Sequence, residues 1–160
     1  MQSVRTLRCV IVDDNRPFMT IAALALERDG VSVVGTATSS ADAMECLERL
    51  RPDVTLVDIE LGGESGFDLA ETIHRQQWAP ALEVILMSAH DEHDFVNEVA
   101  ASPALGFLPK MRLSGAAIRK LLDGAKGDEE TKPVRSRTRS GSSPSGCRLN
   151  AFGRDSRRSV

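Results

Sequence analysis

Aromatic residues are scarce in this chain of 160 residues, which has five Phe, one Trp and no Tyr. Its hydrophobic core must therefore be built mainly from aliphatic side chains and Ala. Cysteine is rare as well: Cys9, Cys46 and Cys147 are odd in number and form no CxxC pair. This argues against a disulfide framework and favours a reducing compartment, so we expect a cytoplasmic protein.

Long apolar runs are absent too. No stretch approaches the 18 or so apolar residues that a membrane-spanning helix needs, and the N-terminus lacks the apolar core of a signal peptide. We therefore expect no membrane-embedded segment and no membrane partner.

Charge is unevenly distributed. Residues 125–160 hold nine Lys or Arg against four Asp or Glu, a net of +5, whereas residues 1–124 hold eleven against nineteen, a net of −8. The basic segment is rich in Ser, Arg, Gly and Pro and has little to bury, so we predict that it is a disordered tail. Its charge suits nucleic acid, anionic lipid or the acidic body of the chain, and the sequence leaves these open.

The apolar pattern of residues 1–124 alternates between strand and helix. Continuous apolar runs are typical of strands that are covered on both faces. Residues 7–12 form a nearly continuous run of this kind, residues 31–37 are rich in β-branched side chains, and further strand-like runs occur at 54–57, 84–87 and 105–108. Apolar residues at helical spacing follow each run. This predicts an α/β fold with a doubly wound, five-stranded parallel sheet and five helices in three α/β/α layers.

Polar side chains follow four of the predicted strands. Asp13 and Asp14 close the first strand, Asp58 the third and Ser88 the fourth, and Lys110 comes after the fifth. In a doubly wound sheet these strand ends meet at one edge, where ligands bind. Two carboxylates about 4 Å apart repel by roughly 4 kcal/mol at an effective dielectric near 20, so the acidic pair needs a cation. Carboxylates suit Mg²⁺, Lys and Ser suit a phosphoryl group, and an Asp can accept that group as the nucleophile.

The order and spacing of these residues resemble the receiver domain of two-component response regulators, which has the CheY-like fold. The motifs are VDD at 12–14, VDIELGGESGF at 57–67, LMSAH at 86–90 and GFLPK at 106–110. The resemblance covers about residues 7–124. It implies a flavodoxin-like sheet of strand order 2-1-3-4-5, a receiver domain over 1–124 and a separate tail over 125–160.

The resemblance also implies the roles of the acidic residues. Asp58 is expected to be the phosphoacceptor. Mg²⁺ would be held by Asp14 and Asp58, by Asp13 through water, and by the backbone carbonyl of Glu60. Lys110 would bind phosphoryl oxygens.

Further roles follow from the same resemblance. Ser88 would also hold the phosphoryl group, and the small Ala89 would leave room for it. Phe107 stands at the position of an aromatic switch residue, which turns inward when Ser88 moves. Glu60 and His90 occupy positions that tune dephosphorylation.

As a member of this family, the chain would be a phosphorylatable switch and not an enzyme on other substrates, although it would catalyse its own phosphorylation and slow hydrolysis. A sensor histidine kinase would be the phosphodonor. Residues 91–124 would form the output face, either for an unidentified downstream protein or for a homodimer. Nucleic acid is a partner only if an effector domain exists.

Three alternatives stay open. The 106–122 stretch resembles receivers of NarL-type regulators, so the chain could be part of a DNA-binding transcriptional regulator whose effector domain is missing or replaced by the tail. A phosphatase of the haloacid dehalogenase type also uses an aspartyl phosphate, but its DxD pair is lacking here. HDEHD at 90–94 suggests a metal site, although a charged loop leading into a helix is the preferred interpretation.

Overall fold

The computed structural model describes residues 6–78, 81–90 and 92–131. Contacts within the chain divide it into two units, Met1–Asp123 and Gly124–Val160, and all the strands of the described residues lie in the first. Most of the segment for which we predict disorder, residues 132–160, lies outside the described residues.

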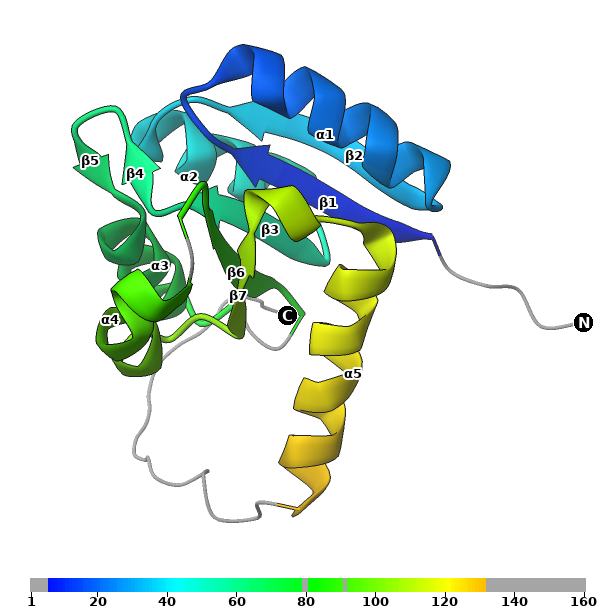
Figure 1. Ribbon diagram of the computed structural model, residues 1–160, viewed down its shortest axis with the longest axis vertical. Coiled ribbons are helices and arrows are strands. Elements are labelled where there is room, and N and C mark those ends of the chain that lie inside the picture. Colours follow the sequence, from blue (N-terminus) through cyan, green and yellow to red (C-terminus); the bar gives the residue numbers. More distant parts are fainter. Residues whose placement is uncertain (1–5, 79–80, 91, 132–160) are drawn as a thin grey trace, which may run out of the picture. The chain divides into compact units, whose positions relative to one another are not determined.

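Five parallel strands form the central sheet in the order β2-β1-β3-β6-β7 (Figure 1). They are β1 (Leu7–Val12), β2 (Val31–Ala37), β3 (Val54–Asp58), β6 (Glu83–Ser88) and β7 (Gly106–Pro109). The predicted order 2-1-3-4-5 is therefore confirmed. The first two strands have the predicted bounds, β3 differs by one residue at its end, and β6 and β7 differ by one residue at each end.

Helices cover both faces of this sheet (Figure 1). One face packs against α1 (Arg16–Arg28) and the beginning of α5 (Gly115–Thr131), and the other against α2 (Ser40–Leu50), α3 (Gly66–Arg75) and α4 (Val96–Ala101). Side chains alternate along β1 to supply both cores. The last four residues of β1, CVIV, are all buried, which explains why they form a continuous apolar run.

Serine caps begin three of the helices. The Ser39 hydroxyl accepts a hydrogen bond from the Asp42 N–H at 3.2 Å at the start of α2. Ser65 opens α3, and the Ser114 hydroxyl accepts from the Ala117 N–H at 3.0 Å at the start of α5. These bonds satisfy N–H groups that have no partner within the helix.

The last helix is longer than the apolar pattern indicates. We expected the folded pattern to end at Gly124, but α5 continues to Thr131. Residues 125–131 include Ala, Lys and Glu, which are good helix formers, and extending an existing helix is much easier than nucleating one.

Short elements lie between the main ones. A two-stranded antiparallel hairpin, β4 (Glu60–Leu61) and β5 (Glu64–Ser65), follows β3. The 3-10 helices η1 (Glu92–Phe95) and η2 (Lys110–Arg112) precede α4 and follow β7. Within the described part of the chain, no helix is long and apolar enough to span a membrane.

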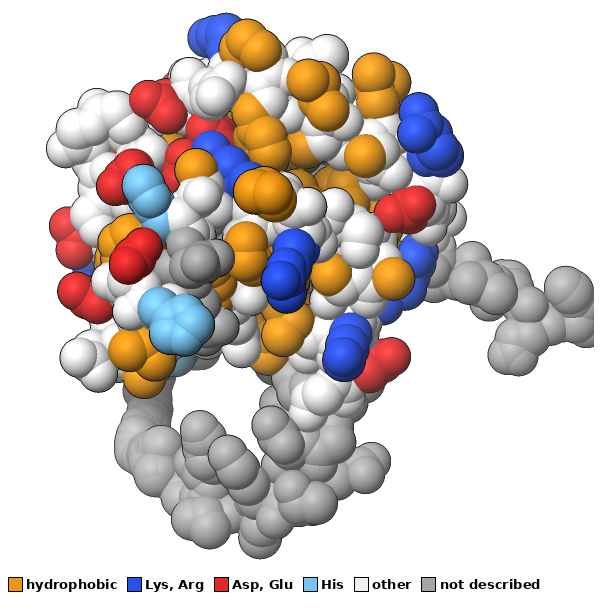
Figure 2. Space-filling model, viewed as in Figure 1, with side chains coloured by type: hydrophobic (Ala, Val, Ile, Leu, Met, Phe, Trp, Pro, Cys, Tyr) orange, Lys and Arg blue, Asp and Glu red, His pale blue; other side chains and the backbone are white. Residues whose placement is uncertain are grey.

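Apolar side chains gather on the surface over α1 (Figure 2). Ile21 and Leu24, both on this helix, are 67 % and 61 % exposed. Met111, in η2, is exposed as well. The outer face of α1 is therefore less polar than that of an ordinary surface helix.

Candidate functional site

Three carboxylates converge where β1 and β3 end. Val12 pairs with Val57 in the parallel ladder, so Asp13, Asp14 and Asp58 emerge at the same edge of the sheet. One oxygen of each carboxylate lies within 4.8 Å of the others. Asp13 and Asp58 are buried, whereas Asp14 is exposed. The structure thus brings together the acids that the sequence singled out.

Asp13 is held by the start of α1 and by Lys110. Its Oδ1 accepts a hydrogen bond from the backbone N–H of Asn15 at 2.9 Å. Its Oδ2 forms an ion pair with Lys110 Nζ at 2.7 Å, but among the described residues no donor is aligned with this oxygen as in a hydrogen bond. A fully buried carboxylate oxygen without an aligned donor has unused capacity for a cation.

Lys110 joins the two buried acids. Pro109 pairs with Ser88 at the end of the sheet, which places Lys110 next to the acids. Its Nζ donates a hydrogen bond to Asp58 Oδ2 at 3.1 Å in addition to the ion pair with Asp13. Burial lowers the pKa of the Lys110 ammonium, but the two carboxylates outweigh this, so the pKa lies above its usual value and the group stays charged.

Asp58 is a buried carboxyl with incomplete charge compensation. Its pKa is raised from 3.8 to about 6, mainly because the group is buried and in smaller part because of the charge of Asp13. The backbone N–H of Glu60, which donates to Asp58 Oδ1 at 3.0 Å, and Lys110 both act in the opposite direction. At neutral pH the group is mainly ionised, in surroundings that favour an added positive charge.

The donor set fits a hard divalent cation. Three carboxylates face one small volume with a single ammonium among them, and Asp13 Oδ2 accepts no hydrogen bond from the described residues. Mg²⁺ prefers such oxygen ligands and keeps several waters, for which the exposed side of Asp14 leaves access. Glu60, whose backbone carbonyl we expected to contribute, lies in β4 directly after the site.

The hairpin β4–β5 borders the site on the side of Asp14. Gly62 and Gly63 form its turn with φ angles of +50° and +95°, as a two-residue hairpin turn with positive φ requires. A Cβ on Gly62 would be 2.9 Å from Asp14 Oδ2. Leu61 is buried in the core, and Glu64 Oε1 accepts a hydrogen bond from the Ser40 N–H at 2.8 Å. The hairpin is therefore anchored at both strands.

Ser88 and Ala89 lie at the end of β6. Asp58 pairs with Met87, so Ser88 is one residue beyond the level of Asp58 in the neighbouring strand. Ser88 is 1 % exposed, and its hydroxyl accepts a hydrogen bond from the His90 N–H at 3.0 Å. Ala89 and His90 are exposed.

Phe107 points inward. It is 7 % exposed and packs in the core beneath α2 and α3, where Val99 of α4 also contacts the cluster. Phe95, in the expected output segment, contacts two other rings. Its ring centroid is 6.2 Å from that of His90 and 6.4 Å from that of Phe67. Asp91, the first residue of the expected output face, lies outside the described residues.

Among the described residues, the histidines of HDEHD are not part of a metal cluster. Within residues 6–78, 81–90 and 92–131, the one group of three or more potential ligands is that of Asp13, Asp14 and Asp58. His90 and His93 are both exposed. The preferred interpretation of this stretch as a charged loop leading into a helix agrees with η1 and α4.

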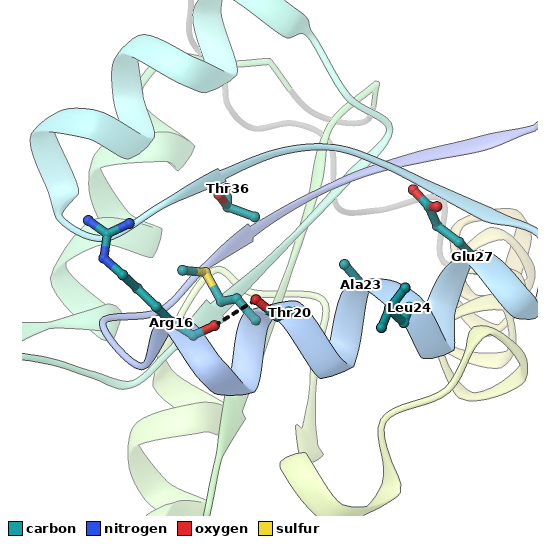
Figure 3. A pocket seen from close by; sticks show the side chains of 7 residues that line it. Arg16, Thr20, Ala23, Leu24, Glu27 and Thr36 are labelled. Atoms are coloured by element: carbon teal, nitrogen blue, oxygen red, sulfur yellow. Dashed lines mark hydrogen bonds between the residues drawn. The ribbon is translucent and has the colours of Figure 1, made fainter.

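A separate hollow of about 360 Å³ lies between α1 and β2 (Figure 3). Arg16 and Glu27 stand toward its two ends, and the Thr20 hydroxyl donates to the Arg16 carbonyl at 3.3 Å. None of the acids of the site lines it. The hollow is therefore separate from the acidic site at the strand ends.

Some residues of the site were missed at the level of sequence. Asn15 caps α1 by accepting a hydrogen bond from the Phe18 N–H at 3.0 Å, and Phe18 places its ring 4.5 Å from Lys110 Nζ. Asn before Pro17 is a helix-start signal that could have identified the cap. Nothing in the sequence indicates the contact of Phe18 with Lys110, because it joins residues 92 positions apart.

The fold and this site define a CheY-like α/β receiver domain, and comparison with known families agrees. Residues 9–122 match the response regulator receiver domain. The chain belongs to the response regulator receiver domain family.

Two curated relatives are transcriptional regulators. "Probable transcriptional regulatory protein NarL" of Mycobacterium tuberculosis is 34 % identical over 128 residues, which are 79 % of this chain and 58 % of the relative. The "DNA-binding transcriptional activator EvgA" of Escherichia coli is 26 % identical over 106 residues, which are 65 % of this chain and 50 % of EvgA. The chain thus spans little more than half the length of these relatives.

Solved structures share the architecture. The signal receiver domain of NarL from Mycobacterium tuberculosis superposes with a TM-score of 0.66 at 33 % identity, covering 78 % of this chain and 99 % of that one. A CheY-like receiver domain protein from Methanospirillum hungatei gives a TM-score of 0.62 at 20 % identity, covering 80 % and 99 %, and bears on the fold alone.

Proposed function

We propose that the chain is the receiver of a two-component phosphorelay, in which Asp58 accepts a phosphoryl group from a sensor histidine kinase. The observation that carries this proposal is a buried carboxylate, Asp58, with an ammonium and two further carboxylates around it. Phosphoryl transfer needs little covalent chemistry from a protein beyond a positioned nucleophile and matched charges. That is what this site offers.

A bound Mg²⁺ would offset the repulsion between the acids and the incoming phosphoryl anion. Asp14 and Asp58 would hold it directly, Asp13 through water, and Glu60 through its backbone carbonyl. The fit rests on the three convergent carboxylates, which have a single ammonium, Lys110, paired with Asp13 and Asp58.

The residues of the chain then have distinct tasks. An Oδ atom of Asp58 forms the new bond to phosphorus as the bond from phosphorus to the histidine nitrogen of the kinase breaks, and that nitrogen keeps the electron pair. Lys110, already 3.1 Å from Asp58 Oδ2, neutralises charge on the phosphoryl oxygens. Ser88 donates its hydroxyl to them, and Ala89 leaves space.

Phosphorylation would be read out through Ser88 and Phe107. To reach the phosphoryl group, the Ser88 hydroxyl has to give up its contact with the His90 N–H, which frees the segment that leads into η1 and α4. Phe107 would then stabilise the second arrangement by packing. Residues 91–124 would change their surface for a downstream protein or for a homodimer.

Residues at the rim would set the lifetime of the phosphoryl group. Glu60 and His90 are both exposed and stand directly beyond Asp58 and Ser88 in the chain. Their side chains would shape the access of the attacking water. The domain would thus catalyse its own phosphorylation and hydrolysis without turning over other substrates.

A second candidate is the receiver part of a DNA-binding regulator. It is favoured by the names of NarL and EvgA and by the coverage of only 58 % and 50 % of their lengths. In this case residues 1–124 form the receiver of a cytoplasmic protein, and the basic tail over 125–160 stands where an effector domain would follow. Sequencing the gene beyond codon 124 tests this directly.

Incubation with acetyl phosphate and Mg²⁺, followed by intact-mass measurement, tests the proposal. We expect one phosphoryl group to be added to the wild-type protein. None should be added in the presence of EDTA or to Asp58→Asn. Asp68→Asn, which changes an exposed acid of α3, should still take up one group. A label that persists in Asp58→Asn contradicts the assignment. Sustained release of phosphate from small phosphate esters would favour the phosphatase instead.

A further inference from the structure

The ring of Phe18 lies against the ammonium group of Lys110, with Nζ 4.5 Å from the ring centroid. An ammonium within about 6 Å of an aromatic ring is attracted by the negative face of the ring. Phe18 belongs to the first turn of α1, and Lys110 follows β7. The contact therefore joins the first helix to the last strand across the acidic site.

Hydrogen bonds at the start of α1 hold the backbone of Phe18, from which the ring projects. The Phe18 N–H donates to Asn15 Oδ1 at 3.0 Å, and the Asn15 N–H donates to Asp13 Oδ1 at 2.9 Å. The other oxygen of Asp13 is 2.7 Å from Lys110 Nζ. These contacts form a closed chain through Asp13, Asn15, Phe18 and Lys110. Asp13 therefore contacts both the start of α1, which carries the ring, and the Lys110 ammonium.

To stay beside Asp58 during the reaction, the Lys110 ammonium needs a contact that the cation and the phosphoryl group do not disrupt. Both of its ion-pair partners, Asp13 and Asp58, belong to the acidic cluster that a cation and a phosphoryl group would engage. Its side chain is a flexible four-carbon stem that can turn away to solvent once these bonds weaken. The Phe18 ring offers no oxygen ligand to Mg²⁺ and no polar hydrogen to a phosphoryl oxygen, so neither group would displace it from Lys110 by binding to it directly.

We propose that Phe18 is a positioning residue for Lys110, whose ring keeps the ammonium beside Asp58 while the carboxylates change partners. This inference rests on the proposed phosphoryl-accepting function. Phe18 does not touch the phosphoryl group and acts through Lys110 alone.

Phosphorylation rates of two variants test the role of the ring. Phe18→Leu keeps an apolar side chain in α1 but removes the ring, and we expect phosphorylation by acetyl phosphate to slow by about threefold to thirtyfold. Phe18→Trp, which restores an aromatic face, should recover most of the rate. Leu24→Ala, which truncates another apolar residue of α1, is the matched control and should be neutral. Equal losses with Leu and Trp overturn the proposal.

A double-mutant cycle separates positioning from a merely structural role. In a Lys110→Met background, Phe18→Leu should cause no further loss in beryllofluoride affinity measured with Mg²⁺, since the partner of the ring is gone. A loss of the same size in both backgrounds would show that Phe18 acts on the fold and not on Lys110.

One measurement does not depend on phosphorylation. In the wild-type protein without metal, nuclear Overhauser contacts should join the Phe18 ring protons to the Lys110 ε-protons. If the wild type takes up no phosphoryl group, the proposed function fails, and these contacts still report on the pairing. Their absence overturns the inference by itself.

Discussion

Gly66 lies so close to the backbone of Asp58 that a β-carbon added to it would be 2.1 Å from the Asp58 carbonyl oxygen. The Gly66 N–H also donates to the Ile59 carbonyl at 2.9 Å. The first residue of α3 is thus packed directly on the end of β3, and the hairpin β4–β5 is the chain that loops out between them. The position of the acidic site depends on this approach.

Gly66→Ala should destabilise the protein by about 1–3 kcal/mol or more, because the methyl group overlaps backbone atoms that cannot rotate away. Urea unfolding measures the change. Gly124→Ala is the matched control: nothing lies within 4 Å of its added Cβ. It lies inside α5, so this change should instead stabilise the protein by roughly 0.5–1 kcal/mol.

The stability of the metal-free protein should fall as pH rises through the titration of Asp58. The folded carboxyl has a pKa of about 6 against 3.8 ordinarily, so between these values the folded state binds the extra proton. The free energy of unfolding should decrease by about 1–2 kcal/mol from pH 4 to about pH 7, as the pH passes through the folded pKa, and then level.

Chemical denaturation with EDTA at several pH values checks this. In Asp58→Asn that part of the pH dependence should vanish, whereas Asp68→Asn, the exposed control, should keep it. A wild-type profile that matches Asp58→Asn throughout this range would show that burial does not perturb the carboxyl.

Lys110→Met should bind Mg²⁺ about tenfold more tightly or better, although it accepts a phosphoryl group poorly. The ammonium sits 2.7 Å from Asp13 Oδ2 and 3.1 Å from Asp58 Oδ2, where it repels an incoming cation and occupies ligand atoms. Isothermal titration calorimetry measures the affinity. Lys120→Met, an exposed lysine of α5, should change nothing, and weaker binding in Lys110→Met would refute the competition.

Glu64→Ala should reduce the free energy that holds the hairpin β4–β5 against α2 by about 0.5–1.5 kcal/mol, because the Ser40 N–H at the start of α2 loses its acceptor, Glu64 Oε1. Faster amide hydrogen exchange at Ser40 is the direct readout. Glu71→Ala, at an exposed position of α3, serves as the control. Unchanged exchange at Ser40 would mean that this bond does not anchor the hairpin in solution.

Most of the fold was predictable because the strands are aliphatic and covered on both faces. Runs such as Leu7–Val12 and Val31–Ala37 are mainly aliphatic or β-branched and are followed by the polar residues Asp13 and Thr38, so their bounds were correct. The hairpin β4–β5 could not be predicted, since two-residue strands carry no periodicity. The end of α5 was missed because the apolar pattern stops before the helix does.

The acids of the site were predictable because they directly follow the apolar runs that form the strands. Asp13, Asp58 and Lys110 each stand where an apolar run stops, and parallel topology brings such positions together. Phe18 and Gly66 were not, because their roles depend on neighbours that are distant in sequence.

The most direct measurement is a titration of the ¹⁵N-labelled protein with beryllofluoride in the presence of Mg²⁺. We predict saturable shifts at the amides of Asp13, Asp58, Ser88 and Lys110 that extend into residues 92–124, and none of them in Asp58→Asn. A spectrum that does not change on titration, or that changes equally in Asp58→Asn, would contradict the assignment of Asp58 as the phosphoacceptor.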